Sequence, residues 1–290
     1  MPGCKFGAIC WPVACLLILQ CGSLIRPTVR SDIIIPNGGK YSTFCRHLEE
    51  ARITRCEVLE RAGQSDEFKR ARDALQSKIG RFQLEGLLIP GTYRVRLQSS
   101  DPRCLSCDEP MYQRNAVALL KAMLPATLKR LESMKERHGL SIYEQIILAS
   151  IVEKEAVSNA DYDRVAAVFL RRLQRNMPLG SCPAVEYALG FHRPFLLFKD
   201  IRIRSPYNLY VNRGLPPGPI AFFTSGALAG VENPATTDDL FFVYDWTLSK
   251  LFFANRYSFH EKNAERARKN YIEKFGRRSL YRADYDRFYE

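Results

Sequence analysis

Apolar residues recur at helical spacing along most of the body of the chain, separated by polar or turn-forming residues. The segment 141–156 differs, because its apolar residues lie on every side of the predicted helix, which is typical of a buried helix. Two apolar runs, LFFVY at 240–244 and LFFAN at 251–255, are predicted to pair as a hairpin. The amphipathic spacing predicts further helices over 41–62, 66–79, 115–137, 161–174 and 224–231.

The remaining segments predict short strands, turns and one long loop. A strand is expected over 31–36, and the Gly- and Pro-containing run 82–93 is expected to be a strand and turn. The proline-rich stretch 205–220 is predicted to be an ordered loop, and the basic stretch 259–278 a helix. The predicted fold class is α+β, with mixed helices and short sheets.

The N-terminus has a different pattern. Residues 6–25 carry no charge, and Lys5 precedes them. A helix of this length spans the hydrocarbon core of a bilayer, about 30 Å thick. Residues 1–25 are therefore predicted to be an export signal or a membrane anchor. No A-x-A-like cleavage site follows, which favours a retained anchor; a lipoprotein signal with Cys21 as the lipidated residue is the alternative.

Composition adds a constraint on partners. The 290 residues are 46% hydrophobic and carry a formal net charge of +12, as expected for a folded protein with a polyanionic partner. Nucleic acid, anionic lipid headgroups and an acidic wall polymer all have that charge. Because the protein is predicted to be exported, nucleic acid is not expected as a partner. The remaining polyanionic candidates are the membrane headgroups and the wall polymer.

Predicted export also bears on the state of the cysteines. Four of the nine cysteines lie in the N-terminal segment, which leaves Cys45, Cys56, Cys104, Cys107 and Cys182. An odd number cannot be fully paired. The CxxC spacing of Cys104 and Cys107 fits a metal half-site, a redox pair, a local disulfide or free thiols. Zinc needs a second ligand pair that the sequence lacks, so no metal is predicted and a loop disulfide is favoured.

The candidate chemistry rests on carboxylates, because GxSxG, P-loop and HExxH patterns are absent from the sequence. The buried helix ends with Glu153 and Glu155, which point in different directions. Burial raises the pKa of a carboxyl group, as a general acid for a glycosidic oxygen requires. Glu85 is a candidate second carboxylate. The alternative for Glu155 is a salt bridge to a neighbouring Arg.

Several motifs occur in a characteristic order, and together they resemble the YceG-like family, the endolytic murein transglycosylases. The similarity covers about residues 33–263. The motifs are LEGLLIPGTY at 84–93, ASIVEKEA at 149–156, RVAAVFLRRL at 164–173, SPYNLY at 205–210 and GLPPGPI at 214–220.

The resemblance implies an organisation for the whole chain. Residues 1–25 would be a single-pass inner-membrane anchor, 26–80 a shortened LysM-like α/β module, 81–275 the catalytic domain on the periplasmic side, and 276–290 a basic tail. The implied substrate is nascent peptidoglycan. Cell-wall synthases are candidate partners, and no cofactor is implied.

The resemblance also implies a reaction and its residues. The glycan would be cut between N-acetylmuramic acid and N-acetylglucosamine, leaving a 1,6-anhydro end. The single acid/base matches Glu155, with Glu153 as its structural partner. Candidate binding or supporting residues are Glu85, Tyr187, Ser205, Tyr207, Asn208 and Tyr210.

Five places depart from the family pattern. Gly91 and Cys182 stand where the family has Asp, Arg171 where it has Asn, and Phe222 to Thr224 replace Asn-Pro-Gly. The late His is replaced near Lys250 or Leu251. A second interpretation therefore stays open, namely a catalytically degenerate peptidoglycan-binding or scaffold protein of the same fold.

Overall fold

The structure is a computed structural model that describes residues 28–81, 83–99 and 109–282. The predicted membrane anchor, Cys21 and the Cys104–Cys107 pair lie outside the described residues. Among the helices within these ranges, none combines the length and the apolar character needed to cross a bilayer.

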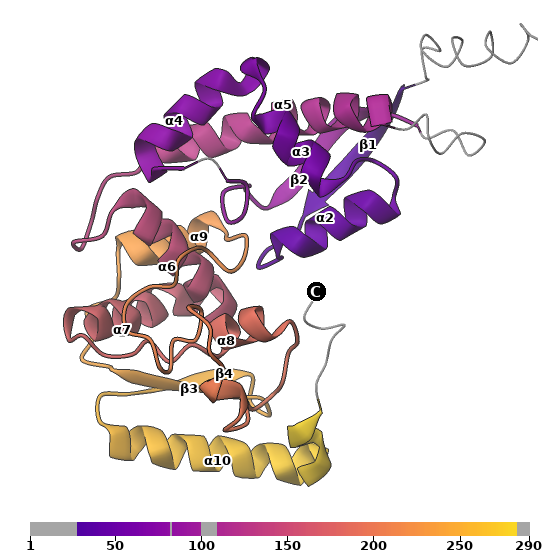
Figure 1. Cartoon of the computed structure of the whole chain (residues 1–290). Coiled ribbons are helices and arrows are strands. Elements are labelled where there is room, and N and C mark those ends of the chain that lie inside the picture. Colours follow the sequence, from indigo (N-terminus) through magenta and orange to yellow (C-terminus); the bar gives the residue numbers. More distant parts are fainter. Residues whose placement is uncertain (1–27, 82, 100–108, 283–290) are drawn as a thin grey trace, which may run out of the picture.

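The chain forms two packed halves of mixed helices and short strands, an α+β architecture (Figure 1). In the first half, β1 (Thr28–Ile35) pairs antiparallel with β2 (Gly91–Gln98), with Ile35 opposite Gly91. The helices of this half are α2 (Tyr41–Glu50), α3 (Cys56–Gly63), the 3₁₀ turn Asp66–Phe68, α4 (Lys69–Ile79) and α5 (Glu109–Ser133). The hydrophobic core of this half contains residues of β2 and α5 as well as residues from the segment before residue 80. The domain boundary expected at residue 80 stays a prediction.

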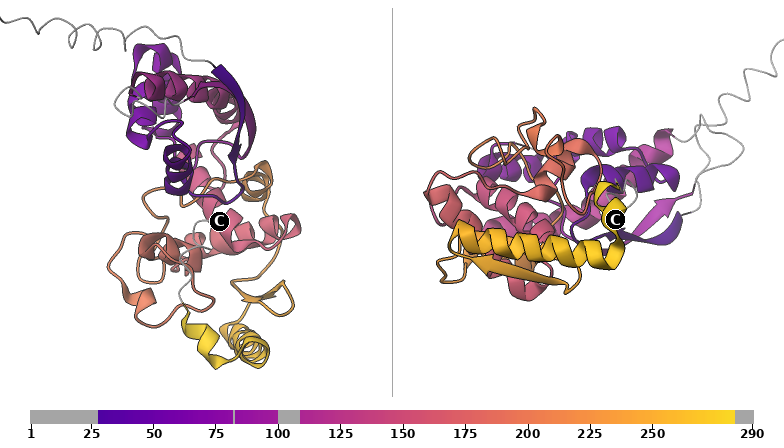
Figure 2. Two further views of the ribbon diagram at one scale, coloured as in Figure 1. Left: turned by 90° about the vertical axis from the view of Figure 1, so that its right-hand side faces the viewer. Right: turned by 90° about the horizontal axis from the view of Figure 1, so that it is seen from below.

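The second half is built around one buried helix, α6 (Ile142–Glu155). The hairpin lies between α10 and the rest of this half, and α10 forms the end of the molecule farthest from β1 (Figures 1 and 2). The other elements are α7 (Tyr162–Gln174), α8 (Cys182–Leu189), α9 (Ser225–Glu232), β3 (Phe241–Asp245), β4 (Lys250–Ala254), α10 (Tyr257–Phe275) and the 3₁₀ turns Asn159–Asp161, Asp200–Arg202 and Arg277–Tyr281.

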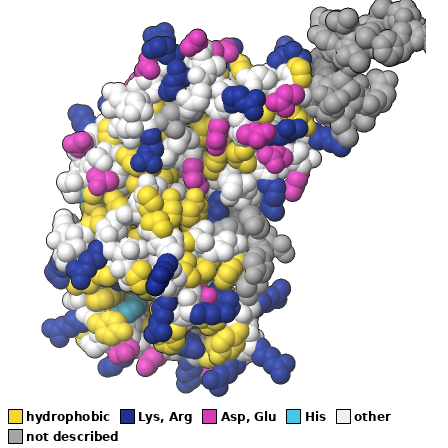
Figure 3. Space-filling model, viewed as in Figure 1, with side chains coloured by type: hydrophobic (Ala, Val, Ile, Leu, Met, Phe, Trp, Pro, Cys, Tyr) yellow, Lys and Arg dark blue, Asp and Glu magenta, His cyan; other side chains and the backbone are white. Residues whose placement is uncertain are grey.

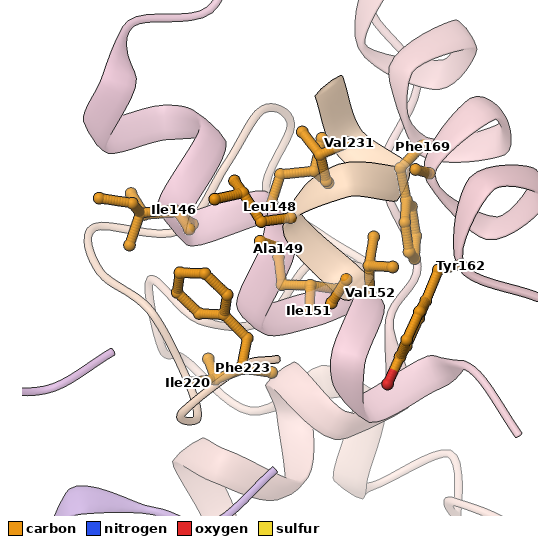
Figure 4. Packing of buried hydrophobic residues seen from close by; sticks show 14 of the residues in the cluster. Ile146, Leu148, Ala149, Ile151, Val152, Tyr162, Phe169, Ile220, Phe223 and Val231 are labelled. Atoms are coloured by element: carbon orange, nitrogen blue, oxygen red, sulfur yellow. The ribbon is translucent and has the colours of Figure 1, made fainter. Parts of the chain in front are cut away.

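The prediction that α6 is buried on all sides is confirmed. Ser141 caps its start, and the Glu144 carboxylate accepts a hydrogen bond from the Ser141 backbone N–H at 2.8 Å, which completes a capping box. Phe169 of α7 and Phe223 of the loop before α9 pack against opposite sides of the helix (Figure 4). This packing fixes the position of the last turn of α6, where Glu153 and Glu155 lie.

A turn of the first half docks against the end of α6. The Gly38 N–H donates to the Phe222 carbonyl at 3.1 Å, and the Phe222 N–H donates to the Gly39 carbonyl at 2.7 Å. Lys154 of α6 donates from Nζ to the Gly38 carbonyl at 3.2 Å. The two halves are therefore held together beside the candidate acid, and the next residue, Lys40, is buried there.

Two predicted elements are wrong in detail. The helix expected over 41–62 is broken into α2 and α3, because Arg52 adopts a left-handed φ of 52° and the Ile53 N–H turns back to the Leu48 carbonyl at 2.8 Å. The strand expected within 82–93 begins only at Gly91, since Leu84 and Leu88 are buried in a turn rather than along a strand.

The other predicted helices and strands within the described residues agree with the structure, and one further helix, α8, was not predicted. The helices at 66–79, 161–174, 224–231 and 259–278, the strand at 31–36, the hairpin and the loop at 205–220 are confirmed within a few residues, and the helix expected at 115–137 begins earlier, at Glu109. Helix α8 was missed, although Ser181 as N-cap and Pro183 in the first turn are its sequence signal.

The structure pairs Cys45 of α2 with Cys56 of α3, with Cα atoms 5.2 Å apart. Sequence spacing did not single out this pair. The bond joins the two helices that flank the break at Arg52. Cys182 is the free cysteine among the described residues.

Opening the Cys45–Cys56 bond is expected to lower the free energy of unfolding by about 2–3 kcal/mol, because a short closed loop restricts the unfolded chain by that amount. Urea unfolding of the oxidised and reduced protein measures the difference. The variant Cys45→Ala/Cys56→Ala is the control. It lacks this bond, so the bond can contribute no difference in its stability between the two conditions. Equal stability of the wild type with and without reductant would contradict the prediction.

Candidate active site

Glu155 is the last residue of α6, and its carboxyl group meets the N-terminus of α8. The Ser181 side chain and the Cys182 backbone N–H hydrogen-bond this carboxyl group. Its other oxygen, Oε1, is buried and has no hydrogen-bond partner among the described residues. The hydrogen bonds from α8 therefore leave Oε1 without a partner among the described residues.

The protonation state of Glu155 suits an acid at neutral pH. Burial raises the pKa of its carboxyl group to about 7, and the negative charge of Glu186 acts in the same direction. The hydrogen bond from Ser181, the positive charge of Arg172 and the N–H of Cys182 act in the opposite direction and only partly offset burial. A carboxyl group with this pKa both donates and accepts a proton near pH 7.

Arg172 and Tyr210 are two further neighbours of Glu155. The Arg172 guanidinium donates to the carbonyls of Leu179 at 2.5 Å and Leu240 at 2.6 Å, so its position is fixed by the backbone. The Tyr210 hydroxyl lies 3.0 Å from the Cys182 Sγ. Burial raises the pKa of the Cys182 thiol to about 12, so a neutral thiol occupies the place of the family's Asp.

Glu85 and two tyrosines form a second polar group from other parts of the chain. The Tyr187 hydroxyl donates to Glu85 Oε1 at 2.7 Å, and the rings of Tyr187 and Tyr207 lie 4.8 Å apart. Burial raises the pKa of Glu85. The Tyr143 hydroxyl donates to Gln83 Oε1 at 3.2 Å nearby. Adjacent aromatic faces and hydroxyls are suited to stacking on sugar rings and hydrogen-bonding them.

Three predicted residues hold the loops in place. Glu153 accepts hydrogen bonds from the Thr224 N–H at 2.9 Å and hydroxyl at 2.8 Å, so it anchors the start of α9. The buried Asn208 amide donates to the carbonyls of Ile201 at 3.0 Å and Ile203 at 2.9 Å. The Ser205 hydroxyl accepts from the Tyr207 N–H at 3.2 Å.

Four residues near Glu155 or Glu85 were not singled out by the sequence, namely Lys40, Ser181, Arg172 and Glu186. Lys40 is 6% exposed, and burial and the charge of Lys154 lower its pKa to about 6, against the attraction of Glu186 and Glu85. Lys40 and Glu85 both belong to the first half but are far apart in sequence, and Lys40 comes near Glu186 only because the two halves dock.

Most of the positions that depart from the family pattern lie outside the polar groups around Glu155 and Glu85. Gly91 opens β2, and Arg171 pairs with Asp238 at 2.8 Å. Phe222 is buried between the halves, and Lys250 begins β4. Cys182 is the departure that reaches the carboxyl group of Glu155. Within the described ranges, no group of three or more His, Cys, Asp or Glu could hold a metal.

Comparison with known proteins gives consistent results. The chain is 37% identical over 163 residues to an endolytic murein transglycosylase of Bacillus subtilis, and 34% identical over 191 residues to one of Streptococcus pneumoniae. These alignments cover 55% and 63% of this chain but 41% and 32% of the relatives, so the chain matches less than half the length of each.

The fold has a similar solved structure, a putative YceG-like protein of Listeria monocytogenes. The TM-score is 0.53 at 27% identity, and the match covers 81% of this chain and 75% of the other. The model of the YceG-like family matches residues 15–266. This chain therefore belongs to the YceG-like family.

Proposed function

We propose that the chain is an endolytic murein transglycosylase that cuts peptidoglycan glycan strands between N-acetylmuramic acid and N-acetylglucosamine, with Glu155 as the single acid/base. The observation that carries the proposal is the buried carboxyl group of Glu155, with its pKa near 7 and one oxygen left unpaired. The names of its relatives support the substrate class.

The proposed reaction needs one carboxyl group, because the nucleophile belongs to the substrate. Protonated Glu155 gives its proton to the glycosidic oxygen, and the bond from C1 of N-acetylmuramic acid to that oxygen breaks. The resulting carboxylate then removes the proton of the sugar's 6-hydroxyl, whose oxygen bonds to C1. Water is not consumed, and Glu155 ends protonated, ready for another cycle.

The supporting residues have separate roles in this proposal. Tyr187 and Tyr207 form the aromatic contact for a sugar ring, and Glu85, held by Tyr187, accepts hydrogen bonds from sugar hydroxyls. In Figure 3, Lys and Arg side chains are spread over the face and along its outline, with hydrophobic side chains between them. Basic side chains around such a face suit a carboxylate-bearing wall polymer.

Digestion of purified sacculi tests the proposal. Mass spectrometry of the products should show 1,6-anhydro ends with the wild type. Glycan binding without new ends would instead favour the non-catalytic scaffold interpretation, and new reducing ends would indicate a hydrolase.

The rate is expected to fall as pH rises above about 7, because the first step needs protonated Glu155. Measurement of kcat/KM for anhydro-end formation across the pH range checks this. A descending limb that starts near the ordinary Glu value would contradict the assignment of Glu155 as the acid.

The location of the protein is also a proposal. The uncharged run at 6–25 and the family assignment support a single-pass anchor in the inner membrane, with the catalytic part in the periplasm, or a lipoprotein through Cys21. A shortened LysM-like module over 26–80 is part of the same proposal. Cell-wall synthases are the proposed protein partners.

A further inference from the structure

Three aromatic rings at the start of β3 and the start of α10 form a cluster that the proposed reaction does not use. The rings of Phe241 and His260 are stacked, with centroids 5.4 Å apart and planes 22° apart. Tyr257 packs edge-on against Phe241 at 5.8 Å and lies 6.0 Å from His260. Each ring therefore contacts the other two, and we call these three residues the aromatic platform.

The platform is built by the packing of α10 on the hairpin (Figure 1). Tyr257 and His260 lie three residues apart in the first turn of α10, so they share one face of that helix. Phe241 is the first residue of β3, and successive side chains of a strand point to opposite faces. The next residue, Phe242, packs on Phe169 of α7 with ring centroids 5.6 Å apart, while Phe241 meets the first turn of α10.

The platform is open to solvent at Tyr257. This residue is 62% exposed, whereas Tyr271 farther along the same helix is 7% exposed. Burial and the positive charge of Arg172 lower the pKa of His260, against the attraction of Glu261, so the imidazole is neutral near pH 7. An exposed phenol ring beside a neutral imidazole is suited to stacking on the apolar face of a sugar and hydrogen-bonding its hydroxyls.

Arg172 connects the platform to the surroundings of Glu155. Its guanidinium carbon lies 5.2 Å from the centroid of the Phe241 ring. The same guanidinium donates to the carbonyl of Leu240, the residue before Phe241, and to that of Leu179. Leu179 lies three residues before α8, the helix whose start meets Glu155. One side chain therefore contacts both the platform and the segment that leads to the candidate acid.

We propose that the aromatic platform is a further binding site for the glycan strand, in which Tyr257 stacks on a sugar ring outside the candidate active site. The role rests on the proposed function, because the occupant is the same polymer. A strand that is cut within its length extends beyond the cleaved bond in both directions, so its sugars reach past Glu155. Arg256, which is exposed and directly precedes Tyr257, supplies a positive charge for the carboxylates that the strand carries.

Binding measured in the Glu155→Gln protein tests the platform without turnover. Tyr257→Ala in this background is expected to weaken binding to soluble, uncrosslinked glycan strands that keep their peptides by about threefold to tenfold, because one ring contact is lost. Isothermal titration calorimetry measures the affinity. Tyr257→Phe keeps the ring and should bind almost as tightly as the parent. In the active protein, Tyr257→Ala should raise KM by a similar factor and leave kcat nearly unchanged.

Phe259→Ala is the matched control on the same turn of α10. Phe259 is 51% exposed, and residues two apart on a helix project about 200° apart, so its ring points away from that of Tyr257. Its replacement should leave binding to the strands unchanged. Both alanine variants should melt close to the parent, because both side chains are largely exposed.

The outcomes separate the platform from the proposed function. Unchanged binding in Tyr257→Ala, or equal losses in Tyr257→Ala and Phe259→Ala, would overturn the platform. Weaker binding of Tyr257→Ala to phosphatidylglycerol vesicles, with unchanged binding to the strands, would overturn it in favour of a lipid surface. A wild type that binds the strands but forms no anhydro ends would overturn the proposed function alone.

Discussion

Replacing Glu155 with glutamine is expected to reduce formation of 1,6-anhydro ends by about 10³-fold or more, because the amide neither donates nor accepts the proton. The amide has nearly the shape of the carboxyl group and still accepts from Ser181 and the Cys182 N–H. The fold should therefore survive. Mass spectrometry of digested sacculi measures the loss.

The same variant should gain stability at alkaline pH. The pKa of Glu155 is about 7 in the folded chain and near the ordinary 4.5 in the unfolded one. Below pH 4.5 the carboxyl group is protonated in both the folded and the unfolded chain, so it imposes no penalty on folding. As pH rises from 4.5 toward 7, the unfolded chain ionises first and the free energy of unfolding falls. Above about pH 7 the full penalty is present. It is on the order of 3 kcal/mol. Glu155→Gln lacks this penalty and should melt higher than wild type at alkaline pH.

Glu153→Gln is the matched control on the same turn of α6. Its carboxylate accepts two hydrogen bonds from Thr224 at the start of α9, so its loss should lower the melting temperature. Turnover should be affected far less than in Glu155→Gln. A large stability loss in Glu155→Gln at neutral pH would instead make Glu155 a structural residue.

Gly86→Ala is expected to destabilise the protein by about 2–4 kcal/mol and to reduce activity with it. Gly86 has a left-handed φ of 72°, and a Cβ there would lie 2.3 Å from Pro219 Cγ. Backbone strain contributes about 1 kcal/mol, and overpacking adds about 1–3 kcal/mol. The clash would separate the LEGLLIPG turn from the GLPPGPI loop and displace Glu85.

Gly80→Ala separates strain from the clash. Gly80 has a nearly equal φ of 74°, but a Cβ there meets nothing within 4 Å. Urea unfolding of both variants should give about 1 kcal/mol for Gly80→Ala and a clearly larger loss for Gly86→Ala. Equal losses would show that the contact with Pro219 is unimportant.

Local patterns predicted those elements whose signals are contained within them. The helix α6 is apolar on every side and capped by Ser141, so both its limits and its burial follow from the sequence. The break at Arg52 was missed because the spacing of apolar residues continues across it. Helix α8 was missed because its eight residues, CPAVEYAL, are apolar nearly throughout and show no helical alternation of apolar and polar positions.

The residues of the candidate site also divide into those that the sequence could predict and those that it could not. Glu155 and the tyrosines of SPYNLY were named from the sequence and the family resemblance. Lys40, Ser181 and Glu186 were not, because their significance depends on neighbours brought from other segments. The role expected for Glu153 stays a prediction, although its contacts with Thr224 are those of a residue that anchors a helix.

The sequence by itself determined the α+β class, the buried helix and the carboxylate at its end, because apolar periodicity and capping are properties of short stretches of chain. Only the tertiary structure decided which charges surround that carboxylate. Burial of Glu155, the proximity of Glu186 and Arg172, and the docking of Lys40 all depend on contacts between distant segments. A pKa depends on distances and solvent exposure, which a sequence does not contain.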